Sequence, residues 1–271
     1  MKVAYQGTKA SFSEIAIERY LEGRAVPIGK ATFEDVFKDL DSGKAELAAI
    51  PIENSLIGPI VENFDLFQRY ETQIVGELCL PIEHCLVGKN SRLEQIKKVY
   101  SHPKALAQCT AFFQAHPWME AVVHYDTAGA AQEIAAKADP ALAAIGSRKT
   151  AEVYQLDLIQ ANLEDDQSNT TRFLFLKKEN ETAIKEGKCS LLITLKHVPG
   201  ALSELLQVLA FFKLNLTQIV SRPIRDKPFE YLFFIDILFS RDHEIELILP
   251  ALREKTETLK LLGIYALSES H

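Results

Sequence analysis

The sequence has little of what marks a membrane, secreted or nucleic-acid-binding protein. It contains no apolar stretch of the roughly 18 residues needed to span a bilayer, and the apolar run after Met1 is too short for a signal peptide. Basic residues number 30 against 37 acidic ones, so the formal charge of -7 gives no basic surface for nucleic acid or anionic lipid. We therefore predict a cytoplasmic protein without nucleic-acid or membrane partners, in which local geometry must hold any anionic ligand.

Cysteine and metal-binding or phosphate-binding motifs are also scarce. The sequence has no Gly-rich phosphate loop, His-Glu-x-x-His or Gly-x-Ser-x-Gly, which leaves kinase, zinc-protease and α/β-hydrolase activities without support. Its few cysteines form no Cys-x-x-Cys pair and no Cys/His pattern of a metal site, so we expect buried thiols, no metal and no cofactor. The cysteines are Cys79, Cys85, Cys109 and Cys189.

What is present is the composition of an ordinary folded protein, with 47% hydrophobic and 25% charged residues among 271. At roughly 100–200 residues per domain, this length predicts about two domains. The least foldable stretch is Lys177–Lys188, where seven of twelve residues are charged. We place the domain boundary there.

Before this boundary, short apolar runs alternate with helical patterns, which indicates an α/β sheet. Helices are expected to begin at Ser11 and Thr32, because each has an acidic residue three positions later, and Gly43 is expected to end the second helix. Polar turns follow the strands, at the sheet edge where open α/β folds bind ligands. The expected strands are Val3–Tyr5, Leu47–Ile50 ending at Pro51, Val99–Tyr100, Val122–Tyr125 and Leu142–Ile145.

After the boundary, the pattern is that of a ferredoxin-like βαββαβ sandwich. The expected elements are strand 190–196, helix 201–213, strand 216–222, strand 231–239, helix 244–257 and strand 261–267. In the strand 231–239 both faces are largely apolar, and one layer of helices cannot easily cover both. We therefore expect a partner surface, supplied most simply by a second copy of the chain.

Three polar turns after predicted strands have two interpretations each. Pro51–Ser55 is either a carboxylate-binding turn or a simple strand exit. Ser101 is expected to cap a helix that begins at Pro103, and a capped helix N-terminus can also hold an anion. In Asp126–Ala131, Gly129 either lets a ligand approach the backbone or belongs to a helix cap alone.

A fourth polar turn, Asp165–Asn169, runs into a strand that has Arg172 between Thr171 and Phe173. A buried guanidinium needs an anionic partner, because an unpaired buried charge is very costly. That partner is either an Asp or Glu of the protein or a bound substrate.

In this order and followed by a ferredoxin-like unit, the segments Pro51–Ser55, Ser101–Pro103, Asp126–Ala131 and Asn169–Phe173 resemble the prephenate dehydratase family with its C-terminal ACT regulatory domain. The resemblance extends from Ala4 to about Leu267. It implies a catalytic region of two α/β lobes, similar to a periplasmic-type binding protein, with the active site between them. The implied division is a catalytic domain 1–177 with lobes 1–77 plus 163–177 and 78–162, a linker 178–188 and an ACT domain 189–271.

The reaction that the resemblance implies removes water and carbon dioxide from prephenate to give phenylpyruvate, the precursor of phenylalanine, without a cofactor. The family's motif gives most weight to Thr171, as a hydrogen-bond donor to the departing hydroxyl, and the further catalytic residues would be Ser101 and Glu53. The proton would come from Glu53 or His102, and the sequence does not decide between them. The implied substrate-binding residues are Asn54, Ser55, Thr127 and Arg172.

Two segments of the C-terminal unit, 199–202 and 215–223, resemble the family's phenylalanine-binding segments. This implies feedback inhibition by L-phenylalanine, bound where two ACT domains meet in a homodimer or homotetramer. The sequence departs from the family pattern at Ala10, where a second glycine is common, and at Val220, where a glutamate usually precedes Ser-Arg-Pro. The implied effector-binding residues are Gly200, Ala201, Leu202, Asn215, Leu216, Ser221 and Arg222.

Two other functions remain open from the sequence. Arogenate dehydratase acts on a substrate with an amino group in place of the side-chain keto oxygen, and motifs this short do not separate the two enzymes. A non-catalytic amino-acid sensor would keep both binding folds, but it would have no need of a leaving-group donor at Thr171. No chorismate mutase region precedes Met1, so we expect a dehydratase that stands alone.

Overall fold

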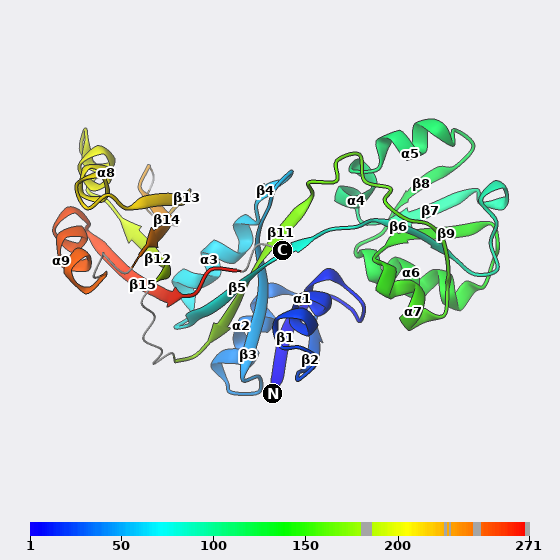
Figure 1. The fold of residues 1–271 in the computed structure, drawn as a ribbon, viewed down its shortest axis with the longest axis horizontal. Coiled ribbons are helices and arrows are strands. Elements are labelled where there is room, and N and C mark those ends of the chain that lie inside the picture. Colours follow the sequence, from blue (N-terminus) through cyan, green and yellow to red (C-terminus); the bar gives the residue numbers. More distant parts are fainter. Residues whose placement is uncertain (180–185, 225–226, 228, 241–244, 269–271) are drawn as a thin grey trace.

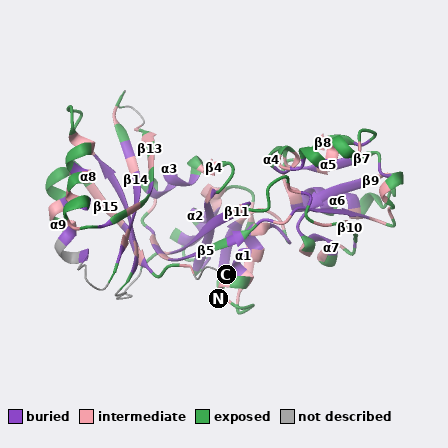
Figure 2. Ribbon diagram, turned by 45° about the horizontal axis from the view of Figure 1, so that its top comes forward, coloured by how far each residue is buried: buried purple, intermediate pink, exposed green. Residues whose placement is uncertain are grey.

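The computed structural model describes residues 1–179, 186–224, 227, 229–240 and 245–268. Three sheets lie in a row along the length of the molecule, each with helices packed on it (Figure 1). The central strands of the sheets, among them β9, β11 and β14, are buried (Figure 2). This arrangement confirms the predicted α/β class.

The first sheet forms the middle of the molecule, with strand order β2-β1-β3-β11-β5 and with β4 paired to β3. Helix α1 packs on one face, and α2 and α3 pack on the other. Ser11 and Thr32 cap α1 and α2 as predicted, because each hydroxyl accepts the N–H of the residue three positions later. The elements are β1 (Lys2–Gln6), α1 (Phe12–Tyr20), β2 (Val26–Lys30), α2 (Phe33–Asp41), β3 (Leu47–Asn54), β4 (Gly58–Pro59), α3 (Val61–Arg69), β5 (Gln73–Pro81) and β11 (Thr170–Lys177).

The second sheet has the order β10-β6-β9-β7-β8, and apolar side chains cover both of its faces. Its elements are β6 (Cys85–Gly88), a 3₁₀ turn η1 (Leu93–Gln95), β7 (Lys98–Ser101), α4 (Pro103–Ala107), α5 (Thr110–Ala115), β8 (Glu120–Val123), α6 (Thr127–Lys137), β9 (Leu142–Gly146), α7 (Arg148–Tyr154) and β10 (Asp157–Gln160). The chain passes between the first two sheets twice, through residues 82–84 and 161–169 (Figure 1). Two α/β lobes joined by two crossing segments confirm the predicted two-lobed fold.

The third sheet is antiparallel with the order β13-β14-β12-β15, which confirms the ferredoxin-like βαββαβ topology. Its elements are β12 (Gly187–Thr194), α8 (Ala201–Phe211), β13 (Asn215–Pro223), β14 (Tyr231–Phe239), α9 (Ile245–Lys255) and β15 (Thr258–Tyr265). Within the predicted linker 178–188, residues 180–185 lie outside the described residues, and β12 begins at Gly187, before the expected strand start.

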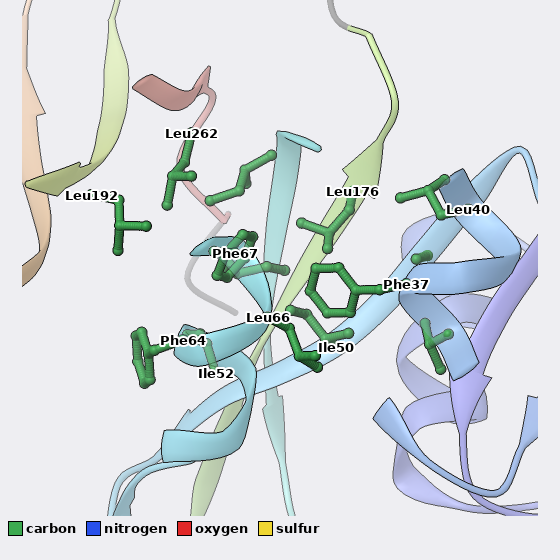
Figure 3. Packing of buried hydrophobic residues seen from close by; sticks show 14 of the residues in the cluster. Phe37, Leu40, Ile50, Ile52, Phe64, Leu66, Phe67, Leu176, Leu192 and Leu262 are labelled. Atoms are coloured by element: carbon green, nitrogen blue, oxygen red, sulfur yellow. The ribbon is translucent and has the colours of Figure 1, made fainter. Parts of the chain in front are cut away.

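The second apolar face of β14 packs against the first lobe of the same chain. Phe234 lies edge-on to Phe64 of α3, with ring centroids 4.8 Å apart, and both rings are fully buried. Figure 3 shows Phe64 and Phe67 close to Leu192 of the third sheet, in one continuous cluster with strands of the first. The inference that this face needs a second copy of the chain is therefore wrong, because α3 covers it.

Two local expectations are corrected by the structure. β3 does not end at Pro51 but continues to Asn54. β1 pairs with β3 only as far as Ala49, so the N–H that proline lacks is not needed by β1. Cys79 is exposed on the edge strand β5, whereas the other three thiols are buried as predicted. Ala10, which replaces a glycine of the family pattern, has a left-handed φ of 67°, a conformation that costs a non-glycine residue roughly 1–2 kcal/mol.

Candidate active site

A cavity of about 530 Å³ lies between the first two sheets, next to the crossing segments. This volume is in the range of small-molecule sites. Both lobes contribute to its wall. Polar and aromatic lining residues include Asn54, Thr171 and Phe173 from the first sheet, His84 from a crossing segment, and His102, Lys104, Gln108, Tyr125, Asp126 and Thr127 from the second lobe.

Alternation along β11 decides which side chains enter the cavity. Thr171 pairs with Asn54 across to β3, and Phe173 pairs with Pro51; all four residues line the cavity. The register shifts between these two pairs, which leaves Ile52 as an extra residue on β3. A bulge of this kind changes which face the following side chains occupy. Without it, alternation from Pro51 would not bring Asn54 to the cavity side.

A chain of buried amide groups fixes the direction of the hydrogen bonds at Thr171. Asn54 Nδ2 donates both to Thr171 Oγ1, at 2.9 Å, and to Asn169 Oδ1, at 2.7 Å. Asn169 Nδ2 donates in turn to Gln108 Oε1, which also lies 2.9 Å from His84 Nε2. Because Thr171 Oγ1 accepts from an amide, its own proton is free to be donated to a ligand.

His84 is held as a neutral ring. It is 2% exposed, and burial lowers the pKa of His84, against smaller opposing contributions from Gln108 and Glu164. Gln108 Oε1 can only accept, so the ring proton is on Nε2. Nδ1 is then an acceptor, and it has no hydrogen-bond partner among the described residues. Sequence reasoning missed His84, which lies in a short crossing segment without a motif, and gave Gln108 no role.

We expect acid pH to destabilise the protein partly through His84. Its pKa is lower in the folded state, so the unfolded chain binds the proton first, and stability is lost as pH falls below about 6.5. One such group contributes at most about 1.4 kcal/mol per pH unit. Thermal unfolding of wild type and His84→Gln from pH 7.5 to 5.0 measures this contribution, and the variant should lose less stability. His197→Gln, at an exposed site, is the control; equal pH dependence in wild type and His84→Gln would contradict the assignment.

In the second lobe, the first turn of α6 is closed by a protein carboxylate. Asp126 caps the helix by accepting the N–H groups of Ala128 and Gly129, and it also accepts the hydroxyl of Thr8 from the first lobe at 2.6 Å. A Cβ at Gly129 would lie about 3 Å from Tyr125 and His124, so the space beside the glycine is already filled. Of the two interpretations of this turn, the structure shows the helix cap. Thr127 lines the cavity.

Positive charge in the cavity is concentrated at one side chain. Lys104 is the one lysine or arginine among the described lining residues. His102 beside it caps α4, its Nδ1 accepting the N–H of Lys104 at 3.2 Å. Burial and the Lys104 charge lower the pKa of His102. The expectation that Ser101 caps this helix is wrong, because Ser101 is the last residue of β7 and His102 is the cap.

Two predicted site residues lie behind the cavity wall or outside it. Ser101 is fully buried, and its hydroxyl donates to the carbonyl of Ile145 at 2.8 Å. Ser55 is exposed; its hydroxyl donates to Ser168 O and accepts the N–H of Thr170, so it ties the end of β3 to the start of β11. Neither residue lines the cavity, so the geometry gives no support to substrate contact for either.

Arg172 and Glu53 face the opposite side of the sheet, toward the C-terminal unit. Arg172 is 5% exposed and forms ion pairs with Glu77 at 2.7 Å, with Asp236 of β14 at 2.6 Å and with Glu53 at 3.3 Å. The prediction that Arg172 binds substrate is wrong, because alternation places it on the face away from Thr171. The same geometry removes Glu53 from the cavity, so it does not contact substrate either.

Burial controls the electrostatics of this cluster. Burial raises the pKa of Asp236, and Arg172 only partly offsets that effect. For Glu77, burial alone would raise the pKa, but Arg172 and Lys188 together lower it below the usual range. Tyr265 also accepts a hydrogen bond from Arg172 at 3.0 Å. The guanidinium therefore joins the first sheet to the third sheet through charged contacts.

The predicted effector residues lie on α8 and β13, at one end and one edge of the third sheet. Gly200 caps α8 with a φ of 86° and is exposed, whereas Leu202 and Leu216 pack against the apolar core under the helices. Arg222 forms a two-bond ion pair with Asp65 of α3, at 2.9 and 3.0 Å. Its guanidinium is thus engaged with the first lobe.

A cavity with polar and apolar walls between two α/β lobes, together with a ferredoxin-like unit, defines a two-lobed small-molecule-binding protein. The model of the family "PDT: Prephenate dehydratase" matches residues 3–181. The bifunctional chorismate mutase/prephenate dehydratase of Enterobacter agglomerans is 36% identical over 97% of this chain and 70% of its own length. The arogenate dehydratase/prephenate dehydratase 2 of Arabidopsis thaliana, a chloroplastic protein, is 37% identical over 98% of this chain and 72% of its own length. The chain belongs to the prephenate dehydratase family.

Two solved structures share this fold over nearly the whole chain. The prephenate dehydratase of Arthrobacter aurescens in complex with L-Phe has a TM-score of 0.89 and 27% identity, covering 98% of this chain and 90% of that one. GqqA, described as a novel type of quorum quenching acylase, has a TM-score of 0.91 and 29% identity, covering 99% of each chain. In the described residues, no helix is both long and apolar enough to span a membrane.

Proposed function

We propose that this chain, a lyase of the prephenate dehydratase family, converts prephenate into phenylpyruvate in the cavity between its two lobes. The observation that carries the proposal is the hydrogen-bond direction at Thr171: its oxygen accepts from Asn54, so its proton is available to a leaving group. The amide chain behind Asn54 holds this direction fixed before substrate binds. Such preorganised donors stabilise charge that develops in a transition state.

The proposed reaction balances without a covalent bond between protein and substrate. Loss of the ring carboxylate as carbon dioxide leaves an electron pair in the ring, which expels the 4-hydroxyl and makes the ring aromatic. One proton converts the departing hydroxide to water, so prephenate dianion plus a proton gives phenylpyruvate, carbon dioxide and water. The protein has to hold the dianion in the reactive geometry, exclude water and donate a hydrogen bond to the leaving oxygen.

We assign parts in this task to the candidate residues in and behind the cavity wall. Thr171 donates to the leaving oxygen, but its hydroxyl is too weak an acid to supply the proton alone. Glu53 faces away from the cavity, so we assign the proton to His102, which lines it. Lys104 supplies the positive charge for a carboxylate, and Thr127 binds the substrate. Asn54 lines the cavity, but its amide group is engaged within the protein, so its part is to orient Thr171. Ser101 acts behind the wall, as a positioning residue for β7.

An assay with two substrates tests this function. We expect purified chain to form phenylpyruvate from prephenate and to prefer it over arogenate, which would yield phenylalanine directly. A relative named for both activities makes arogenate the second candidate substrate. Faster turnover of arogenate would reassign the substrate, and activity on neither would favour an amino-acid sensor.

Regulation, assembly and location complete the proposal. The complex of a structural neighbour with L-Phe supports L-phenylalanine as effector, held by the α8 start and β13. We assign residues 1–177 to catalysis and the ferredoxin-like unit from 189 onward to regulation as an ACT domain, in a cytoplasmic homodimer or homotetramer. Acylase activity is not proposed, because among the described residues no Ser, Thr or Cys side chain of the cavity is hydrogen-bonded to a histidine, the usual pair for acyl transfer.

A further inference from the structure

Two polar side chains of the strand β13 contact the first lobe. Arg222, near its end, is paired with Asp65 of α3, which does not line the cavity. Gln218, in its middle, reaches the strands that carry the catalytic residues. The contact through Gln218 therefore reaches the residues next to Asn54 and Thr171, which line the cavity.

Gln218 bridges two charged side chains of opposite sign. It is 8% exposed; its Nε2 donates to Glu53 Oε2 at 2.5 Å, and its Oε1 accepts from Arg172 Nη1 at 3.2 Å. A carboxamide can do both at once, because it carries a donor and an acceptor on one group. Gln218 is thus a neutral connector between the third sheet and a cross-strand pair of the first.

Of the charged groups in this cluster, Glu53 depends most on Gln218. Arg172 lies within 2.7 Å of both Glu77 and Asp236, but 3.3 Å from Glu53. The Glu53 side chain is also 36% exposed, which weakens its attraction to Arg172 through solvent screening. If Gln218 moves away, Glu53 loses its shortest contact, whereas the other two carboxylates keep theirs.

Glu53 and Arg172 are the immediate neighbours, in the sequence, of Asn54 and Thr171. Glu53 is adjacent to Asn54, Arg172 is adjacent to Thr171, and the two pairs are neighbouring rungs of the β3–β11 ladder. A shift of the Glu53–Arg172 pair would therefore move the backbone that sets the 2.9 Å hydrogen bond from Asn54 to Thr171. The catalytic hydroxyl is thereby sensitive to the position of Gln218.

β13 has an irregular backbone next to Gln218, where a small displacement can occur. Its pairing with β14 shifts register between Leu216 and Gln218, a bulge at which the strand departs from the regular ladder. The proposed effector residues flank Gln218 on the same strand, with Asn215 and Leu216 before it and Ser221 after it. A ligand that contacts both sides of the bulge would change the conformation of the strand between them.

We propose that Gln218 couples effector binding on β13 to the cavity, by holding or releasing Glu53 and Arg172 behind Asn54 and Thr171. This inference rests on the proposed function, since it assigns a route to the regulation of the same site. It makes Gln218 a positioning residue outside the catalytic and effector contacts. Coupling between two sites of a protein typically changes affinity by about 5- to 150-fold.

The test compares three variants of the full chain with wild type. Gln218→Met removes both hydrogen bonds at similar size, and Gln218→Asn keeps an amide but is one methylene too short to bridge. Gln207→Met makes the same change at an exposed position of α8. Phenylpyruvate formation is followed at increasing L-phenylalanine, and L-phenylalanine binding is measured by calorimetry. Thermal unfolding confirms that each variant is folded.

We expect both Gln218 variants to bind L-phenylalanine within about threefold of wild type, yet to retain at saturation a residual rate at least about fivefold higher. Gln207→Met should behave as wild type. Equal maximal inhibition of wild type and both Gln218 variants overturns the inference, as does equal loss of inhibition in Gln207→Met. Loss of effector binding in both Gln218 variants also overturns it, because Gln218 would then act in binding. Wild type that does not turn over prephenate overturns the proposed reaction itself. Wild type that is active but indifferent to L-phenylalanine overturns the inference and the proposed regulation, and leaves the proposed reaction standing.

Discussion

Thr171→Ala lowers kcat for prephenate by about 10²–10³, the usual cost of removing one preorganised donor to a developing charge. Because the contact forms with the leaving oxygen as its bond breaks, kcat and kcat/KM should fall together. Thr171 is 8% exposed and its hydroxyl accepts from Asn54, so alanine removes the donor with little change at the surface. Initial rates of phenylpyruvate formation, with thermal unfolding of the same samples, measure the effect.

Two neighbouring changes control for this prediction. Thr171→Ser keeps the hydroxyl and should retain most of the activity. Thr170→Ala removes the hydroxyl one position earlier, where it donates to the carbonyl of Ser168, and should stay within about threefold of wild type. A folded Thr171→Ala variant with nearly full kcat would show that the leaving oxygen is stabilised elsewhere.

Arg172→Met destabilises the protein by about 3–5 kcal/mol, because it leaves buried carboxylates without their cation. Asp236 is fully buried and the Glu77 side chain is 2% exposed, so neither charge can be solvated by water in place of the guanidinium. At about 2–4 °C per kcal/mol for a chain of this size, the Tm should fall by roughly 10 °C. Differential scanning calorimetry measures this change.

The matched control is Arg24→Met. Arg24 pairs with Glu22 at 3.1 Å, but both side chains are about three-quarters exposed, and such pairs contribute little. Its Tm should therefore stay close to that of wild type. If Arg172→Met were as stable as Arg24→Met, the charged cluster would not be buried in the folded protein. Arg172→Met combined with Asp236→Leu should regain part of the loss, since it removes one of the stranded charges.

The fold could be predicted where the sequence pattern is local. The capping residues Ser11 and Thr32, and the alternation of apolar runs with helices, determine elements from contacts within a few residues. The βαββαβ order of the third sheet follows in the same way. What β14 packs against could not be predicted, because Phe64 lies about 170 residues from Phe234 in the sequence and no local pattern links them.

The site could be predicted only in part, for a reason that lies in the β3–β11 ladder. The motif around Thr171 correctly marks the cavity, and Asn54 and Thr127 line it as well. The sequence does not show the bulge at Ile52 or the direction of each side chain on β11, and these decide that Glu53 and Arg172 face the third sheet. Successive residues of one strand face opposite sides of the sheet, and a sequence motif does not show which residue faces which side.

The packing of β14 on α3 has a consequence for how such a chain can evolve. Leu174 and Leu176 of the first lobe belong to the same apolar cluster as Leu192 and Phe234 of the third sheet. A gene truncated between the first lobe and the third sheet would therefore produce a lobe with an exposed apolar surface, in which Arg172 lacks its partner Asp236. The third sheet is a separate unit in topology, but the first lobe depends on it to remain soluble. Selection for loss of feedback would therefore act more readily through single substitutions than through deletion.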